Sequence, residues 1–187
     1  MSHYVLELFL EEKTERAVQS LWGVVDALAG WTPQVRGAAR PHVSVCSCPS
    51  LDEDAFRQAL AALAADTPPL TVEFASVATF ASAEGVVFLA PVVTADLLAL
   101  HVRLVEAMRQ SGATVPDLYQ PGRWVPHCTL AQGLPPELLS QAVVVSLRQW
   151  SPAVGRIEQV GLVDVSPPLS RVVAQYPLKG QEVQDVP

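Results

Sequence analysis

The spacing of apolar residues predicts a regular succession of strands and helices. Short blocks of β-branched and large apolar residues bounded by proline or glycine are typical of strands, and apolar residues at every third or fourth position are typical of helices. Ser50, Thr94 and the pair Pro135-Pro136 mark helix starts, and Gly112 marks a helix end. In chain order, the expected strands are 4–10, 42–48, 70–80, 86–93, 126–131, 155–165 and 171–178, and the expected helices are 11–28, 50–66, 94–111 and 135–150.

This succession of elements repeats once. Shifting the chain against itself by 85 residues lays strand on strand and helix on helix, and places Pro41-His42-Val43-Ser44-Val45 on Pro126-His127-Cys128-Thr129-Leu130. Two strand-helix-strand-helix-strand units joined by antiparallel hairpins predict an α+β protein. We therefore expect a bilobal fold with two antiparallel sheets about a pseudo-twofold axis, in which the two Pro-His strands meet at a central cleft.

The chain is expected to form a single domain. Its 187 residues suffice for one core shared by two small lobes, and no low-complexity segment or flexible linker divides them. The repeat halves cover about 1–83 and 84–179, and the last residues, 180–187, are expected to form a frayed tail.

Composition narrows the function classes. The longest apolar run, 86–93, is far shorter than the ~20 residues that span a bilayer, so no association with a membrane is expected. The N-terminus has neither a basic flank nor a small-residue cleavage site, so we expect a cytoplasmic protein. A net charge of −7 and only two lysines argue against a protein that grips long nucleic acid through its phosphates. Ten arginines still allow a short or end-bound phosphate ligand. The protein is also expected to be a monomer.

The two Pro-His strands carry groups suited to phosphate chemistry. Alternate side chains of a strand share a face, so His42 and Ser44 project together, as do His127 and Thr129. Across a cleft, a neutral imidazole removes a proton from the attacking oxygen, and a protonated imidazole delivers one to the leaving oxygen. The hydroxyls donate to nonbridging phosphate oxygens as charge develops. This in-line displacement at a phosphodiester needs no metal and no cofactor, and either histidine suits either role.

A single H-x-[ST] tripeptide is weak evidence, because an isolated strand histidine is usually structural. Two copies at equivalent points of a repeat are more specific. The segments RPHVSV and VPHCTLA resemble the paired H-x-[ST]-hydrophobic signatures of the 2H phosphoesterases, and the order of elements over nearly the whole chain is similar to the 2'-5' RNA ligase-like branch of that family.

The resemblance implies a LigT-like bilobal fold and an enzyme that hydrolyses or forms phosphodiesters at RNA 2',3' ends. It also implies that His42 and His127 are the acid-base pair and that Ser44 and Thr129 hold the phosphate. The expected substrate is a 2',3'-cyclic phosphate, at an RNA end or on a small cyclic nucleotide. The reverse reaction would join 2'-5' links. A noncatalytic nucleotide- or RNA-end-binding module of the same fold is the alternative.

Four further residues are candidates for substrate contact. Arg123 and Arg40 precede the two motif strands and are candidates for binding the phosphate, the alternative being solvated arginines at strand ends. Tyr119 and Trp124 are candidates for stacking on a base, and Tyr119 is the preferred one. Packing is the expected role of Phe80. His3 and His101 have no partner motif and are left out of the site.

The three cysteines, Cys46, Cys48 and Cys128, are expected to be free, because a chain without an export signal rarely forms disulfides. A zinc site with histidine is a further alternative, since Cys46 and Cys48 share the face of His42 in a regular strand. Four strand residues separate His42 from Cys46 by about 13 Å, whereas zinc ligands lie within about 2.3 Å of the ion. No metal site is therefore expected.

Overall fold

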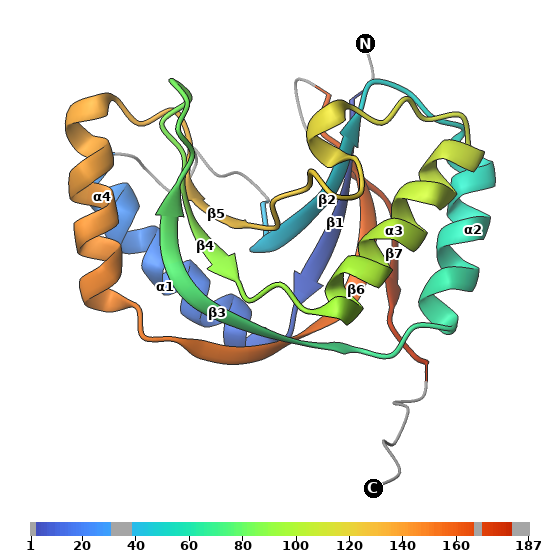
Figure 1. Cartoon of the computed structure of the whole chain (residues 1–187), viewed down its shortest axis with the longest axis horizontal. Coiled ribbons are helices and arrows are strands. Elements are labelled where there is room, and N and C mark those ends of the chain that lie inside the picture. Colours follow the sequence, from blue (N-terminus) through green and yellow to red (C-terminus); the bar gives the residue numbers. More distant parts are fainter. Residues whose placement is uncertain (1–2, 31–38, 167–169, 181–187) are drawn as a thin grey trace, which may run out of the picture.

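The computed structural model describes residues 3–30, 39–166 and 170–180, and within these ranges seven strands and four α-helices form an α+β fold (Figure 1). The strands are β1 (Tyr4–Leu10), β2 (His42–Cys48), β3 (Leu70–Thr79), β4 (Val87–Pro91), β5 (Cys128–Ala131), β6 (Ala153–Asp164) and β7 (Arg171–Pro177). The helices are α1 (Glu12–Ala29), α2 (Glu53–Ala65), α3 (Ala95–Gln110) and α4 (Pro136–Gln149), and a 3-10 turn, η2 (Asp117–Tyr119), precedes β5.

The strand order is symmetric. It runs β2-β1-β6-β3-β4-β5, with β7 on the remaining free part of β6. Exchanging β1 with β4, β2 with β5 and β3 with β6 gives β5-β4-β3-β6-β1-β2. This is the same strand order read from the opposite edge of the sheet. The helices follow the same rule, because α1 packs beside α4 at one end of the sheet and α2 beside α3 at the other (Figure 1). This arrangement supports the proposed repeat.

The α+β class and the antiparallel pairing are confirmed, but the two expected sheets are halves of one hydrogen-bonded sheet. The cause is the length of β6, which has 12 residues. Residues 153–157 of β6 pair with β3, residues 157–164 pair with β1, and residues 159–164 pair with β7. One strand thus belongs to both halves and joins them in one sheet.

Local signals place most element ends close to the predicted positions. Helix α3 begins after Thr94, whose Oγ1 accepts a hydrogen bond from the amide of Leu97 at 3.2 Å, and Gly112 has a φ of 80° just past its end. Helix α2 is capped by Asp52 instead of Ser50, because the Asp52 carboxylate accepts from the amides of residues 54 and 55. Strand β5 begins at Cys128, so His127 lies immediately before it.

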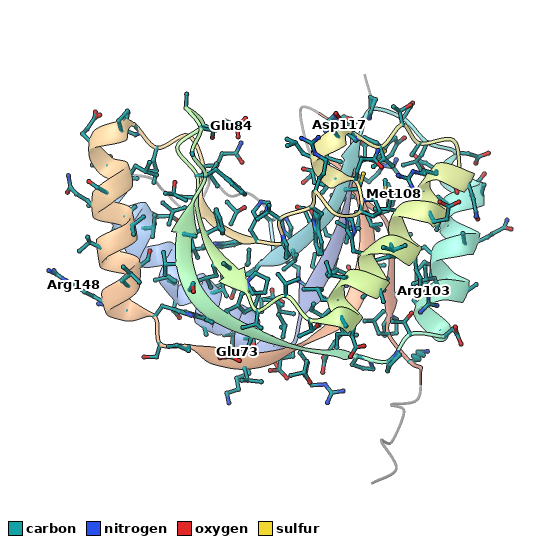
Figure 2. The ribbon with its side chains drawn as sticks, viewed as in Figure 1. Glu73, Glu84, Arg103, Met108, Asp117 and Arg148 are labelled. Carbon is teal, nitrogen blue, oxygen red and sulfur yellow. The ribbon has the colours of Figure 1, made fainter. Side chains whose placement is uncertain are left out.

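A single apolar core extends across both halves of the sheet. Helices contribute amphipathic faces and strands contribute alternating buried positions, and burying one such side chain contributes about 1.5–3 kcal/mol. Met108 of α3, for example, is fully buried at the inner face of its helix (Figure 2). The largest fully buried side chains are Phe56, Phe74, Leu6, Leu8, Leu60, Leu89, Leu97, Leu104, Met108, Leu130, Ile157 and Leu162.

The three cysteines are free and buried, as predicted. Burial raises the pKa of the Cys46 and Cys128 thiols to about 12, so both stay protonated at neutral pH. The alternation of buried and half-buried positions along β2 breaks at Val45 and Cys46, which are both buried. The β1–β2 register shifts at that point, so Cys46 does not continue the row of His42 and Ser44.

The end of the described chain is held in place at Gly180. Its amide donates to the carbonyl of Thr67 at 2.9 Å, and the amide of Lys179 donates to the carbonyl of Ala64 at 3.0 Å. The prediction of a frayed tail from residue 180 is therefore wrong for Gly180 itself, because a backbone hydrogen bond holds this residue against the end of α2. The rest of the predicted tail, 181–187, lies outside the described residues. None of the described helices is long and apolar enough to cross a bilayer.

Replacing Gly85 with alanine is expected to lower the free energy of unfolding by about 1–3 kcal/mol or more. Gly85 has a φ of 58°, and a Cβ there would lie 2.0 Å from the backbone oxygen of Leu134. The amide of Leu134 donates to Gly85 at 3.1 Å, and that of Gly133 donates to Glu84 at 2.9 Å, so the added methyl group would push two bonded loops apart. Denaturant unfolding measures the loss.

Gly112→Ala is the matched control for the Gly85 variant. Gly112 also has a positive φ, 80°, but no atom lies within 4 Å of the position its Cβ would take. This control should show only the cost of the backbone conformation. Equal losses in both variants would contradict the steric explanation.

Candidate phosphate-binding cleft

The two motif strands meet at one cavity. Strands β2 and β5 are the two ends of the strand order, yet they contact each other between the two helix pairs (Figure 1). A cavity of about 650 Å³ lies there. Its lining includes all four motif side chains, His42, Ser44, His127 and Thr129, together with Trp22, Ala39, Tyr119, Ala131, Gln132 and Gly133. The structure thus brings together the four residues that sequence analysis singled out.

Both imidazoles are held in the same way. Nδ1 of His42 lies 2.7 Å from the backbone oxygen of Arg40, and Nδ1 of His127 lies 2.8 Å from that of Val125. A carbonyl oxygen only accepts, so each Nδ1 must carry the hydrogen and donate it. In the neutral ring, Nε2 therefore has the lone pair. Each histidine is thereby prepared to accept a proton at Nε2 or, once protonated, to deliver one.

Burial lowers the pKa of both imidazoles below the usual value of 6.5, and the hydrogen bonds to the backbone partly oppose this shift. A positive charge on His42 further lowers the pKa of His127. Two unassisted histidines in this cleft would therefore both be neutral at pH 7. A group that holds a proton near one of them would make the two different.

Aromatic rings fix the orientation of His127 in particular. The Phe80 ring packs edge to face against it with centroids 5.0 Å apart, and Phe88 packs against it at 5.3 Å. Phe80 and Phe88 also contact each other at 4.5 Å. Phe9 is the corresponding neighbour of His42, at 6.5 Å. Phe80 packs as expected, and it packs on a residue of the cleft.

Two tryptophans connect the halves of the cleft reciprocally. The indole N–H of Trp22 donates to the backbone oxygen of Thr129 at 2.9 Å, and that of Trp124 donates to the backbone oxygen of Ser44 at 2.9 Å. The Trp124 ring is buried and stacks on His101 with centroids 4.1 Å apart. Its face toward His101 is therefore covered. Sequence analysis missed Trp22, because its partner is 107 residues away and no local pattern marks the contact.

Trp124→Phe is expected to reduce both stability and turnover. Loss of the bond to Ser44 should lower the free energy of unfolding by about 0.5–1.5 kcal/mol and loosen the strand that carries His42. Trp150→Phe is the matched control, since the Trp150 indole donates to the backbone oxygen of Phe74 at 3.1 Å. The control should lose similar stability with turnover unchanged. Equal turnover in both variants would show that the Trp124 bond has no special role in the cleft.

A second cavity of about 500 Å³ continues from the first on the His127 side and shares Tyr119, His127, Thr129 and Gln132 with it. Arg123 and Trp124 also line it, and Arg123 is exposed. Glu84 lines the cavity from the loop between β3 and β4 (Figure 2). Tyr119, half-buried, thus lies between the two cavities.

Arg40 is engaged elsewhere. Its Nε and Nη2 donate to the two carboxylate oxygens of Glu15 at 3.1 and 2.6 Å, and its guanidinium lies 4.7 Å from the centre of the Phe9 ring. It lines a small cavity of about 130 Å³ next to His42 instead of the one that contains both histidines. In this arrangement Arg40 affects the cleft through its charge.

Sequence analysis also missed Glu7. This glutamate is 8% exposed, and its Oε1 lies 3.6 Å from Nε2 of His42. Burial raises the Glu7 pKa to about 7, although the Arg40 charge acts in the opposite direction. The available signal was a single acidic residue inside an otherwise apolar strand.

Within residues 3–30, 39–166 and 170–180, no three His, Cys, Asp or Glu side chains are grouped so that they could hold a metal ion.

Comparison with known proteins identifies the family. The sequence matches the model of the 2'-5' RNA ligase superfamily over residues 12–166. None of the curated proteins matches the sequence.

Two solved structures show the shared fold. TT0787 of Thermus thermophilus is 18% identical, with 97% of this chain and 100% of that chain covered and a TM-score of 0.62. E. coli LigT complexed with NADP+ is 16% identical, with 96% and 98% covered and a TM-score of 0.58. The family model covers most of the sequence, which confirms the resemblance carried by the two motifs, and the chain belongs to the 2'-5' RNA ligase superfamily.

Proposed function

We propose that the protein is a metal-independent phosphodiesterase that opens 2',3'-cyclic phosphates at RNA ends or on small nucleotides. One observation carries this proposal. Two imidazoles, each with Nδ1 bound to a backbone oxygen and Nε2 available, line one cavity together with two hydroxyls. Binding alone would not require a matched pair of groups that accept and donate protons.

In the proposed reaction, a water oxygen forms a bond to phosphorus while the bond from phosphorus to one ribose oxygen breaks. One neutral Nε2 takes the proton that the water loses, and the other, protonated Nε2 gives a proton to the departing ribose oxygen. The hydroxyls of Ser44 and Thr129 donate to the nonbridging oxygens, where negative charge increases in the transition state. A 5'-hydroxyl of a second RNA end that attacks in place of water, with the 3'-oxygen as the leaving group, would form a 2'-5' link by the same two proton transfers.

The two connected cavities fit the size of a nucleotide. Their volumes, about 650 and 500 Å³, lie in the range typical of small-molecule sites. With the phosphate between the histidines, a base would extend toward Tyr119, and Arg123 would face the phosphate or the next nucleotide. We propose supporting roles for Trp124, which holds β2, and for Arg40, whose charge lies beside His42. LigT has been solved with 3'-AMP and with NADP+, which supports a nucleotide ligand here.

The proposal is tested by incubating the protein with a panel of phosphodiesters in EDTA. The panel contains 2',3'-cyclic mononucleotides, a 2',3'-cyclic phosphate on a short RNA, 3',5'-cyclic nucleotides and 2'-5' linked dinucleotides, with products separated by chromatography. Turnover of the 2',3'-cyclic compounds, unchanged by EDTA, is the expected result. No turnover together with thermal stabilisation by nucleotide would favour a noncatalytic binding module. Neither turnover nor stabilisation would exclude both.

A further inference from the structure

The two halves of the cleft carry different residues next to the motif hydroxyls, a carboxylate in the first half and a phenyl ring in the second. In the first half, Glu7 of β1 pairs in register with Ser44 of β2. In the second half, Phe88 of β4 pairs in register with Thr129 of β5. A carboxylate beside one histidine thus corresponds to a phenyl ring beside the other. This difference breaks the chemical equivalence of the two imidazoles.

The Glu7 carboxylate faces the reactive nitrogen of its histidine. Its Oε1 lies 3.6 Å from Nε2 of His42, which is not the nitrogen that the backbone oxygen holds. Both groups also line the small cavity of about 130 Å³ that adjoins the cleft. His42 therefore lines both the cavity that contains the two histidines and the small cavity that Glu7 lines.

The other groups that face this pair come from each neighbouring element. Arg40 precedes β2, and its charge is largely matched by Glu15 of α1, which binds it with two hydrogen bonds. His127 lies across the cleft. Strand β6 presents Gly161 opposite Glu7, and β7 contributes the neutral amide of Gln175. Glu7 is accordingly the acidic group that acts directly on His42.

We propose that Glu7 is a positioning residue that shares a proton with Nε2 of His42, an inference that rests on the proposed function. His42 is then the proton donor and His127 the proton acceptor. When the shared proton is on Nε2 of His42, this nitrogen gives it to the leaving ribose oxygen, and the Glu7 carboxylate stays ionised beside the ring. The proton lost by the attacking water goes to His127. Exchange with solvent then returns one proton to the Glu7–His42 pair and removes one from His127.

Electrostatics explain why the shared proton is available. Burial makes the charged form of each group alone unfavourable, raising the pKa of Glu7 to about 7 and lowering that of His42. As a pair they retain one proton until the pH rises through about 7, and moving it to Nε2 creates a compensated ion pair. His127 has Phe88 at the equivalent place and gains no such compensation. Activity should therefore fall as pH rises above about 7.

Nuclear magnetic resonance of labelled imidazoles tests the shared proton directly, with His42 assigned from the spectrum of His42→Ala. The expected result is a titration step of His42 near pH 7 that disappears in Glu7→Gln, with His127 unaffected. Glu7→Asp should retain a step, and Glu53→Gln, on α2, should leave both histidines unchanged. Identical His42 titrations in wild type and Glu7→Gln, or no His42 protonation near pH 7, would overturn the proposal.

Rate measurements on two substrates distinguish a failure of the Glu7 proposal from a failure of the proposed function. In Glu7→Gln, the alkaline limb of the pH–rate profile should move to lower pH. Above pH 7, turnover of a 2',3'-cyclic nucleotide should fall about tenfold for each pH unit of this shift. The substitution should leave turnover of a nucleoside 4-nitrophenyl phosphodiester unaffected, because nitrophenolate departs without a proton. Equal losses on both substrates would contradict proton sharing. An inactive wild type would refute the proposed function, and the imidazole titrations would still decide whether Glu7 shares a proton with His42.

Discussion

Alanine at either His42 or His127 is expected to lower kcat for a 2',3'-cyclic nucleotide by about 10²–10⁴-fold, which is the usual contribution of a general acid or base. Each imidazole has its Nδ1 bound to the backbone and its Nε2 available at one cavity, so no other described group of that cavity replaces either function. Steady-state kinetics with the purified variants measure the loss.

The histidine variants should keep their fold and their ligand. Both side chains lie at the cavity and are only partly buried, so the melting temperature should change little. Nucleotide should still stabilise each variant, because Ser44, Thr129 and Tyr119 are retained. His3→Ala, outside the cleft, is the control and should retain full activity. Turnover that survives in both cleft variants would show that chemistry occurs elsewhere.

Removal of a cleft hydroxyl is expected to lower kcat by about 10²–10³-fold, the usual cost of losing one donor to a developing oxyanion. Thr129→Val keeps the shape of the side chain and removes the donor, and Ser44→Ala does the same on β2. Because the hydroxyls act most strongly in the transition state, kcat should fall more than KM rises. The pH dependence should keep its form, since neither residue titrates.

Two variants distinguish a hydroxyl effect from a packing effect. Thr129→Ser restores the donor without the methyl group and should recover most of the lost rate. Thr79→Val removes an exposed hydroxyl of β3 and should have no effect. Failure of Thr129→Ser to recover activity would indicate that Thr129 acts through packing against its neighbours.

Much of the fold is predictable because it rests on local signals. Apolar periodicity with proline and glycine punctuation located the strands and helices, and Thr94 capped its helix as predicted. The joining of two sheets was not predictable, because it depends on which strands pair along the 12 residues of β6. Pairing partners far apart in sequence leave no periodic pattern. The Asp52 cap was missed because Ser50 and Asp52 are both good capping residues two positions apart.

The site divides in the same way. His42, Ser44, His127 and Thr129 stand in a short repeated motif, so the sequence alone indicates them. Glu7, by contrast, becomes significant only when β1 pairs with β2 and burial changes its pKa.

The other long-range contacts of the cleft were also beyond the sequence. Trp22 reaches Thr129 from another element, and no spacing rule connects them. Arg40 lies close to His42 in sequence, but Glu15 on α1 holds its guanidinium. Local pattern thus finds repeated chemistry, whereas tertiary contacts decide how each group is oriented and charged.

A crystal structure with a uridine oxovanadate complex, which mimics the five-coordinate phosphorus of an in-line displacement, tests the two-imidazole mechanism most directly. The mechanism predicts vanadium in the cavity between β2 and β5, with Nε2 of His42 and Nε2 of His127 within about 3 Å of oxygens on opposite apical sides. The hydroxyls of Ser44 and Thr129 should contact equatorial oxygens. Vanadium bound outside this cavity, or reached by only one imidazole, would contradict it.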